Sequence, residues 1–191
     1  MTGMIAIRGM TGVEHAEPDG SFTLYQPGEP VPPRIRAGDR LRMHLEVDDG
    51  AWIYAVSALR KADHRKLGAW APGERATGGV RLPWPGGRVL TADDAAMTVL
   101  FVIASRDELP WARELTHTDC SSQIGATPAR PPVTLCDHLH GLMWKIPPRI
   151  RGMVPPVVDA FDDGGLRIPA IVSQHRGESF TAIEWQFKPR P

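Results

Sequence analysis

Alternation of apolar and polar residues is the clearest pattern in this sequence. In Arg40–Val47, apolar residues occupy every second position, and arginine, histidine or glutamate fill the positions between them. Successive side chains of a strand point to opposite faces of a sheet, so this segment predicts a strand with one buried face. Asp48-Asp49-Gly50 comes next, followed by the apolar run Ala51–Leu59. Because Asp-Gly supplies the positive φ of a tight turn, we expect the two runs to form a β-hairpin.

Further strands are expected along the chain. Met97–Ala104 is apolar at both alternating sets of positions and rich in β-branched residues, which is typical of a central strand covered on both faces. In Ser179–Phe187, alternation assigns every second residue to one face: Thr181, Ile183, Trp185 and Phe187. The shorter candidates are Ser21–Tyr25, Gly79–Leu82 and Leu166–Ile171.

One helix is indicated after the central strand. Ser105 is a suitable N-cap, and Asp107 and Glu108 place negative charge where the helix dipole favours it. Proline is tolerated only in the first turn, so Pro110 predicts a helix that starts near Arg106 or Asp107. The apolar side of this helix is expected to consist of Leu109, Trp111, Ala112 and Leu115.

These elements predict a mostly β fold, namely a β-sandwich-like domain with one or two short helices and long loops rich in proline and glycine. The sequence contains 19 glycines and 19 prolines, as is typical of a chain with many turns. A chain of 191 residues suits one domain of this kind. We expect a single domain over residues 1–191, with a β core at about 20–118 and a C-terminal extension, 119–191, that completes the same sandwich.

The charged residues balance, with 22 Lys+Arg, 22 Asp+Glu and a net charge of +0. Such a chain has no field to steer it onto DNA, RNA or an anionic membrane, so we expect neither nucleic acid nor membrane as a partner. No apolar run reaches the ~18 residues that span a bilayer, and the first residues lack the apolar core of a secretory signal. With only two cysteines as well, a cytoplasmic location is expected.

Acidic pairs occur at Asp48-Asp49, Asp93-Asp94 and Asp162-Asp163. Calcium loops alternate their oxygen ligands and end on a glutamate, and these pairs do not follow that pattern. Aspartate readily bonds its own backbone in turns, so we interpret all three pairs as turn residues.

A cluster of cysteine and histidine residues carries the candidate metal chemistry: His117, Cys120, Cys136, His138 and His140. In an extended segment the last three point the same way, whereas in a helix only Cys136 and His140 share a face. Thiolates and imidazoles suit Zn²⁺, so the cluster predicts either a zinc-stabilised binding domain or a small metal-dependent hydrolase. The alternative is a protein without a cofactor, in which the cysteines are buried and the histidines lie in loops.

The sequence contains no nucleophile elbow, P-loop, dinucleotide fingerprint or zinc-protease motif, which favours a protein without catalytic activity. We expect Trp70 and Trp84 to lie in loops rich in glycine and proline, and Trp111 lies in the expected helix. Aromatic side chains beside proline and arginine often anchor protein interfaces, so these three are candidate partner-binding residues. Trp70 and Trp84 equally fit a second interpretation, in which they fold back and plug the ends of the sandwich.

Residues 37–109 carry four motifs in succession: AGDRLRMHLEV, AWIYAVSAL, GGVRLPWPGG and MTVLFVIASRDELP. In this order they resemble two strands, a loop element and a central strand with a short helix in DUF4384, a bacterial family of unknown function. The resemblance implies a β-sandwich-like module of a signalling or defence system, acting with a partner such as a caspase-like peptidase or a kinase. We therefore expect a non-catalytic module that binds another protein, with a zinc-binding protein or hydrolase as the alternative.

Overall fold

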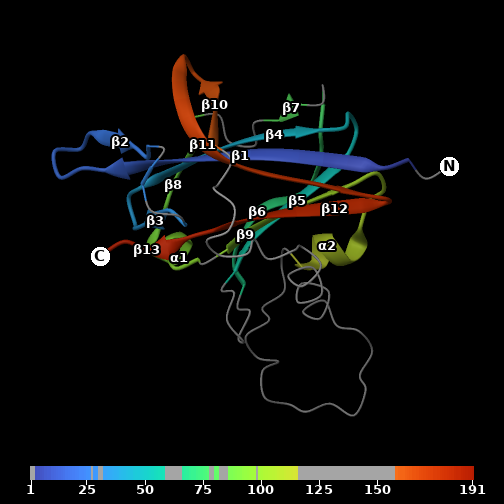
Figure 1. Ribbon diagram of the computed structural model, residues 1–191. Helices are drawn as coiled ribbons and strands as arrows, with labels where there is room; N and C mark the ends of the chain where they lie inside the picture. Colours follow the sequence, from blue (N-terminus) through green and yellow to red (C-terminus); the bar gives the residue numbers. More distant parts are fainter. Residues whose placement is uncertain are drawn as a thin grey trace, which may run out of the picture.

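The computed structural model describes residues 3–26, 28–29, 32–58, 66–77, 80–81, 86–97, 99–115 and 158–191. Within these ranges two large sheets lie face to face, and two short helices lie beside the smaller sheet (Figure 1). The mostly β, sandwich-like fold expected from the sequence is therefore confirmed. No helix in this part of the chain has the length and apolar character needed to cross a membrane.

The larger sheet has seven strands, in the order β10-β11-β1-β4-β7, with β2 pairing beside β1 and β8 beside β4. All of these pairs are antiparallel. The strands are β1 (Ile5–Ala16), β2 (Phe22–Leu24), β4 (Arg40–Val47), β7 (Val80–Arg81), β8 (Arg88–Val89), β10 (Val158–Asp163) and β11 (Leu166–Gly177).

The smaller sheet has four strands in the order β12-β9-β5-β6, and β3 and β13 form a separate parallel pair. These strands are β3 (Arg34–Ile35), β5 (Trp52–Ala58), β6 (Lys66–Arg75), β9 (Val99–Ser105), β12 (Phe180–Gln186) and β13 (Lys188–Pro189). The helices are α1 (Ala92–Ala95) and α2 (Pro110–Leu115). Strands from the last part of the chain thus lie in every sheet, with β11 beside β1 and β12 beside β9.

The main core lies between the two large sheets and is built from alternating positions of their strands. β4 contributes the residues that alternation predicted, Leu41, Met43, Leu45 and Val47. All residues of β9 are buried, because Leu100 and Val102 face this core while Ile103 packs with Ala112 of α2 on the other face. The expected central strand is therefore confirmed. The three shorter candidates contain the strands β2, β7 and β11, and the predicted strand in Ser179–Phe187 is β12.

The middle strand β1, which the sequence patterns did not single out, is packed on both faces at two glycines. A Cβ atom on Gly9 would lie 2.5 Å from side-chain atoms of both Ile183 and Trp185 in the core. On the opposite face, a Cβ atom on Gly12 would lie 2.2 Å from Cγ2 of Ile168. Because real Cβ contacts are longer than this, the close approach of both neighbours requires glycine at these two positions.

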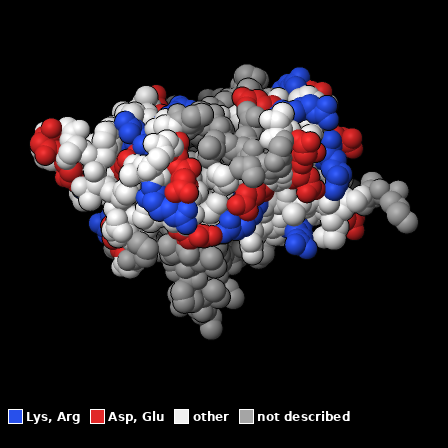
Figure 2. All heavy atoms as spheres, turned by 90° about the horizontal axis from the view of Figure 1, so that it is seen from above, with Lys and Arg blue, Asp and Glu red and all other residues white. Residues whose placement is uncertain are grey.

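β10 and the first half of β11 belong to the larger sheet but fold back over its outer face, where they form a third layer. The ring of Phe161 in β10 stacks on that of His44 in β4, with centroids 5.6 Å apart, and Arg42 Nη1 donates to Asp163 Oδ2 at 2.6 Å. Gly164-Gly165 closes the hairpin with two positive φ angles, as a two-residue turn requires. Asp162 and Asp163, which were expected to be turn residues, instead end β10 directly before this turn. Seen from above, this layer presents basic and acidic side chains in small mixed groups (Figure 2).

The predicted hairpin at Asp48-Asp49-Gly50 is wrong, because β4 and β5 lie in different sheets. The turn itself is present: Gly50 has a φ of +76°, and Ala51 N donates to the Asp48 carbonyl at 3.1 Å. It carries the chain from one sheet to the other, since β4 pairs with β1 whereas β5 pairs with β6 and β9. A local turn sequence fixes the change of direction but does not fix which neighbours the two strands take.

The segment around Trp70 was expected to be a loop but is the edge strand β6. Its pairing with β5 shifts register beside Gly73, which has a φ of +109°. Proline and glycine are compatible with an edge strand that is bulged, so Pro72 does not end the strand.

The two helices also correct the sequence-based expectation. Ser105 ends β9 and does not cap a helix; α2 starts at Pro110, where the missing N–H of proline costs nothing. The hydroxyl of Tyr54 accepts a hydrogen bond from Leu109 N at 2.8 Å just before this helix. Asp93-Asp94 lies in α1 and not in a turn, and Asp94 forms a capping box with the preceding threonine.

We expect Gly9→Ala to destabilise the fold, because the added methyl group overlaps Ile183 and Trp185. Overpacking of this kind costs about 1–3 kcal/mol in unfolding free energy, measurable by urea titration. Gly3→Ala is the matched control, since its Cβ atom would come no closer than 3.4 Å to Arg106. Equal stability of Gly9→Ala and the control would contradict the described packing of β1.

A second prediction concerns His44 beneath the hairpin. Burial lowers the pKa of His44; the Glu46 carboxylate opposes this shift, and the Arg8 guanidinium adds to it. The unfolded chain then takes up the proton first, so the stability that His44 contributes is lost as pH falls below the ordinary histidine pKa of 6.5. We expect His44→Phe, which keeps a ring against Phe161, to lose less stability than the wild type between about pH 7.5 and pH 5. Identical pH dependence of the unfolding free energy in the two proteins would contradict this role of His44.

Candidate functional site

The strands β2, β3 and β13 and the last residues of β1 lie at the same end of the sandwich (Figure 1). A pocket of about 310 Å³ is found among residues of these segments. We call it the end pocket. It is lined by His15, Tyr25, Glu29, Arg34, Arg190 and Pro191. These residues come from segments far apart in the sequence, and their side chains are titratable or polar except for the proline.

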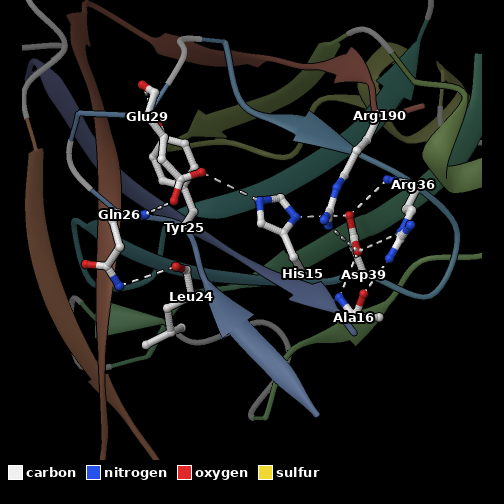
Figure 3. A network of polar contacts seen from close by, with 9 residues as sticks. All are labelled: His15, Ala16, Leu24, Tyr25, Gln26, Glu29, Arg36, Asp39 and Arg190. Carbon is white, nitrogen blue, oxygen red and sulfur yellow. Dashed lines mark hydrogen bonds and ion pairs between the residues drawn. The ribbon is translucent and has the colours of Figure 1, made fainter. Parts of the chain in front are cut away.

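A buried carboxylate, Asp39, organises the wall behind the end pocket (Figure 3). Its side chain is 0% exposed and accepts hydrogen bonds from the backbone N–H groups of Ala16, at 2.9 Å, and Arg36, at 3.0 Å. The guanidinium groups of Arg36 and Arg190 lie 3.9 and 3.8 Å from its Oδ1 atom. A buried charge requires such compensation, so Asp39 fixes the positions of two arginines and the end of β1.

His15 lies between two carboxylates. Its Nδ1 atom is 3.3 Å from Asp39 Oδ2, and its Nε2 atom is 3.9 Å from Glu29 Oε2. A histidine that acts as a general base needs one ring nitrogen directed at the reacting group. Since each nitrogen of His15 faces an acid of the protein itself, the ring is suited to holding the pocket in shape.

Tyr25 and Glu29 form the opposite wall. Tyr25 is buried, and its hydroxyl donates to the backbone carbonyl of Glu29 at 3.1 Å. The Glu29 carboxylate accepts a hydrogen bond from Gln26 N at 2.8 Å. Burial, and then the charge of Glu29, raise the pKa of Tyr25, so the phenol stays protonated at neutral pH and presents an uncharged ring edge.

Four basic residues alternate along the pair of strands β3 and β13. Lys188 lies opposite Arg34 in this parallel pair, and Ile35 between the arginines is buried in the core. Arg34 and Lys188 are exposed, whereas Arg36 and Arg190, which follow the two strands, turn toward Asp39. We call these four residues the cationic ribbon. In the part of the chain that the structure describes, Arg34 and Lys188 have no acidic partner.

The guanidinium group of Arg190 has a hydrogen-bond donor without an acceptor within the described ranges. Its Nη1 atom is buried and has no hydrogen-bond acceptor among the described residues, although Asp39 lies within ion-pair distance. An unsatisfied buried donor costs about 1–3 kcal/mol. Arg190 Nη1 is therefore a donor of this network that no described residue satisfies.

Of the three predicted partner-binding tryptophans, the two that the structure describes, Trp70 and Trp111, lie in different clusters. Trp70 is 4% exposed in the core between the sheets, and the Arg88 guanidinium lies 4.2 Å from its ring centroid. Trp111 packs edge-to-face with Phe180 on the outer face of the smaller sheet, with centroids 5.9 Å apart. Trp84 lies outside the described residues. Of the two interpretations given for Trp70, the buried one agrees with the structure.

The predicted metal ligands His117, Cys120, Cys136, His138 and His140 all lie outside the described residues, so the zinc site stays a prediction. In the ranges that are described, no group of three or more His, Cys, Asp or Glu side chains is arranged to hold a metal ion.

Sequence reasoning missed the end pocket and the cationic ribbon. A signal existed in the alternation of basic residues, Arg-Ile-Arg at 34–36 and Lys-Pro-Arg at 188–190. Nothing local indicates that these two segments pair, or that His15 and Asp39 meet beside them. The pocket depends on contacts between the first, second and last parts of the chain.

We expect Asp39→Asn to destabilise the protein strongly, because it leaves Arg36 and Arg190 beside a neutral side chain. Removing one partner of a buried ion pair costs about 3–5 kcal/mol, which chemical unfolding would measure. Asp162→Asn is the matched control: its side chain is 72% exposed and pairs with the exposed Arg167, so a change below about 1 kcal/mol is expected. Similar losses in both variants would show that Asp39 does not organise this end of the sandwich.

Comparison with known proteins gives no match to this chain among protein-family models, curated proteins or solved structures. Its function is therefore inferred from the geometry of the end pocket and the cationic ribbon.

Proposed function

We propose that this chain is a non-catalytic β-sandwich module that binds another protein through the end pocket and the cationic ribbon. One observation carries the proposal. Arg34 and Lys188 lie on the outward face beside a pocket and have no acidic partner among the described residues. Most other basic side chains in that part of the chain lie within ion-pair distance of an acid, as Arg8 does with Glu46 and Arg167 with Asp162. Unpaired charge beside a pocket favours a partner surface of opposite sign.

The chemistry of the pocket supports binding over catalysis. Both ring nitrogens of His15 face carboxylates of the chain, and the Tyr25 hydroxyl donates to a backbone carbonyl. Asp39 is fully buried behind them. The groups that would serve as acid, base or nucleophile are thus engaged with one another, whereas the arginines remain able to bind an anion.

Exposed apolar side chains at the same end of the sandwich extend the proposed interface. Phe22 in β2 is 37% exposed, and Val89 in β8 is 51% exposed. Both lie beside Arg40, whose guanidinium carbon is 4.4 Å from the Phe22 ring centroid and whose backbone pairs with Val89. A stable interface buries about 800 Å² on each partner, more than the pocket alone offers, and apolar contacts supply much of its free energy.

The resemblance of residues 37–109 to the DUF4384 family adds a class of partner to this proposal. Modules of that family accompany caspase-like peptidases and kinases, so an enzyme of one of these classes in a bacterial signalling or defence system is the proposed partner. An acidic surface on that enzyme would complement the cationic ribbon.

We expect a double variant, Arg34→Glu with Lys188→Glu, to lose the partner. Wild-type and variant chains would be used to capture proteins from an extract of the source cells, with quantitation by mass spectrometry. The captured amount of a true partner should fall at least about tenfold, because the acidic surface of the partner would face acidic side chains in the variant. The matched control is Arg176→Glu, which reverses another exposed arginine without an acidic partner in the described ranges, on β11 away from the pocket. A set of captured proteins that is the same for the wild type and the double variant would refute the proposal.

A further inference from the structure

The end pocket is bordered by positive charge that the described acids do not fully pair. Arg34 lines it without an acidic partner among the described residues, whereas Arg36 and Arg190 face Asp39. Asp39 is already satisfied by two backbone N–H groups as well as by arginines. The remaining positive charge therefore lies on the solvent side, on Arg34 and Arg190.

The guanidinium groups of Arg34 and Arg190 are of the kind that binds a carboxylate. A guanidinium group offers N–H donors in a planar fork that binds the two oxygens of a carboxylate side by side. Arg190 makes only a 3.8 Å ion pair with Asp39, its side chain is 28% exposed, and Arg34 is exposed in the adjacent strand. Two such groups, Arg34 in β3 and Arg190 directly after β13, border the same pocket.

The walls of the pocket favour a carboxylate over a phosphate group. The Glu29 side chain is 39% exposed in the lining and would repel a second negative charge. A phosphate monoester carries about −1.5 to −2 at neutral pH, so Glu29 repels it more strongly than it repels a carboxylate. Tyr25 and Pro191 provide apolar surface against which the methylene groups of an acidic side chain can pack.

We infer that the end pocket binds a carboxylate of the partner protein, held by Arg34 and Arg190. This inference rests on the proposed function, in which the same end of the sandwich contacts a protein. The carboxylate has two sources, a glutamate or aspartate side chain and the terminus of a chain, and the pocket chemistry is the same for both.

Small probes test this with the full-length protein. Glutamate capped at both backbone ends offers a side-chain carboxylate, N-acetylalanine offers a terminal one, and capped glutamine is the neutral match. Inorganic phosphate is the competing anion. Each would be titrated while the backbone amide signals of Arg34 and Arg190 and the ring signals of His15 are followed by NMR. For ligands of so few atoms, saturation with a dissociation constant on the order of 10 mM is expected.

The expected result is saturable shifts with at least one carboxylate probe and none with capped glutamine. The stronger of the two carboxylates identifies the source. Arg34→Gln should weaken this binding at least about fivefold, because it removes one of two charge-assisted contacts. Arg176→Gln should leave it unchanged. Arg34 is exposed and outside the Asp39 network, so its replacement does not threaten folding, and Arg190→Gln serves as a second variant.

Several results would overturn the inference: no saturable shift with either carboxylate, equal shifts with capped glutamine, or saturation by phosphate alone. The outcome is separable from that of the capture experiment. Loss of a partner in the double variant without carboxylate binding would leave the proposed function standing and remove this inference. Carboxylate binding without any charge-dependent partner would support the carboxylate site in the end pocket and refute the proposed binding of a protein.

Discussion

The fold depends on close packing against both faces of β1. This strand lies in the middle of the larger sheet, with β11 on one side and β4 on the other. Gly9 admits Ile183 and Trp185 on its inner face, and Gly12 admits Ile168 on its outer face. Any larger residue at either position would separate the layers by more than a packed interior tolerates. Both the sandwich and the third layer over it therefore start from these two glycines.

Charged side chains are buried beneath the third layer, and their ion pairs determine the position of this layer on the sheet. Arg42 is buried beneath the hairpin and donates both to Glu14 Oε2, at 2.7 Å, and to Asp163 Oδ2, at 2.6 Å. Gly86 N adds a further hydrogen bond to the same aspartate. Buried charges are costly unless every one is paired, so a shifted hairpin would leave Arg42 without its acids. The arrangement thus links β1, β4 and the β10–β11 turn in one register.

Like the ion pairs of Arg42, the end pocket is formed by segments that are distant in the sequence. β1 contributes His15, the turn before β4 contributes Asp39, and the residue after the last strand contributes Arg190 (Figure 3). Asp39 is held by two backbone N–H groups and faces Arg36 and Arg190, whereas Arg34 has no acidic partner among the described residues. A structural network of this kind holds the proposed binding surface in one arrangement, which would reduce the entropy lost on binding.

The sequence by itself determined the strands whose burial alternates locally. Leu41 and Met43 in β4 and Trp185 in β12 took the faces that their spacing predicted, because a strand turns successive side chains to opposite sides whatever its neighbours are. The tertiary structure alone decided which strands pair, so the turn at Gly50 joins two sheets and does not close a hairpin. It also decided the site, since His15 and Arg190 lie at opposite ends of the chain and meet only because β3 pairs with β13. Pairing depends on which distant surfaces are complementary, and this information is not contained in any local pattern.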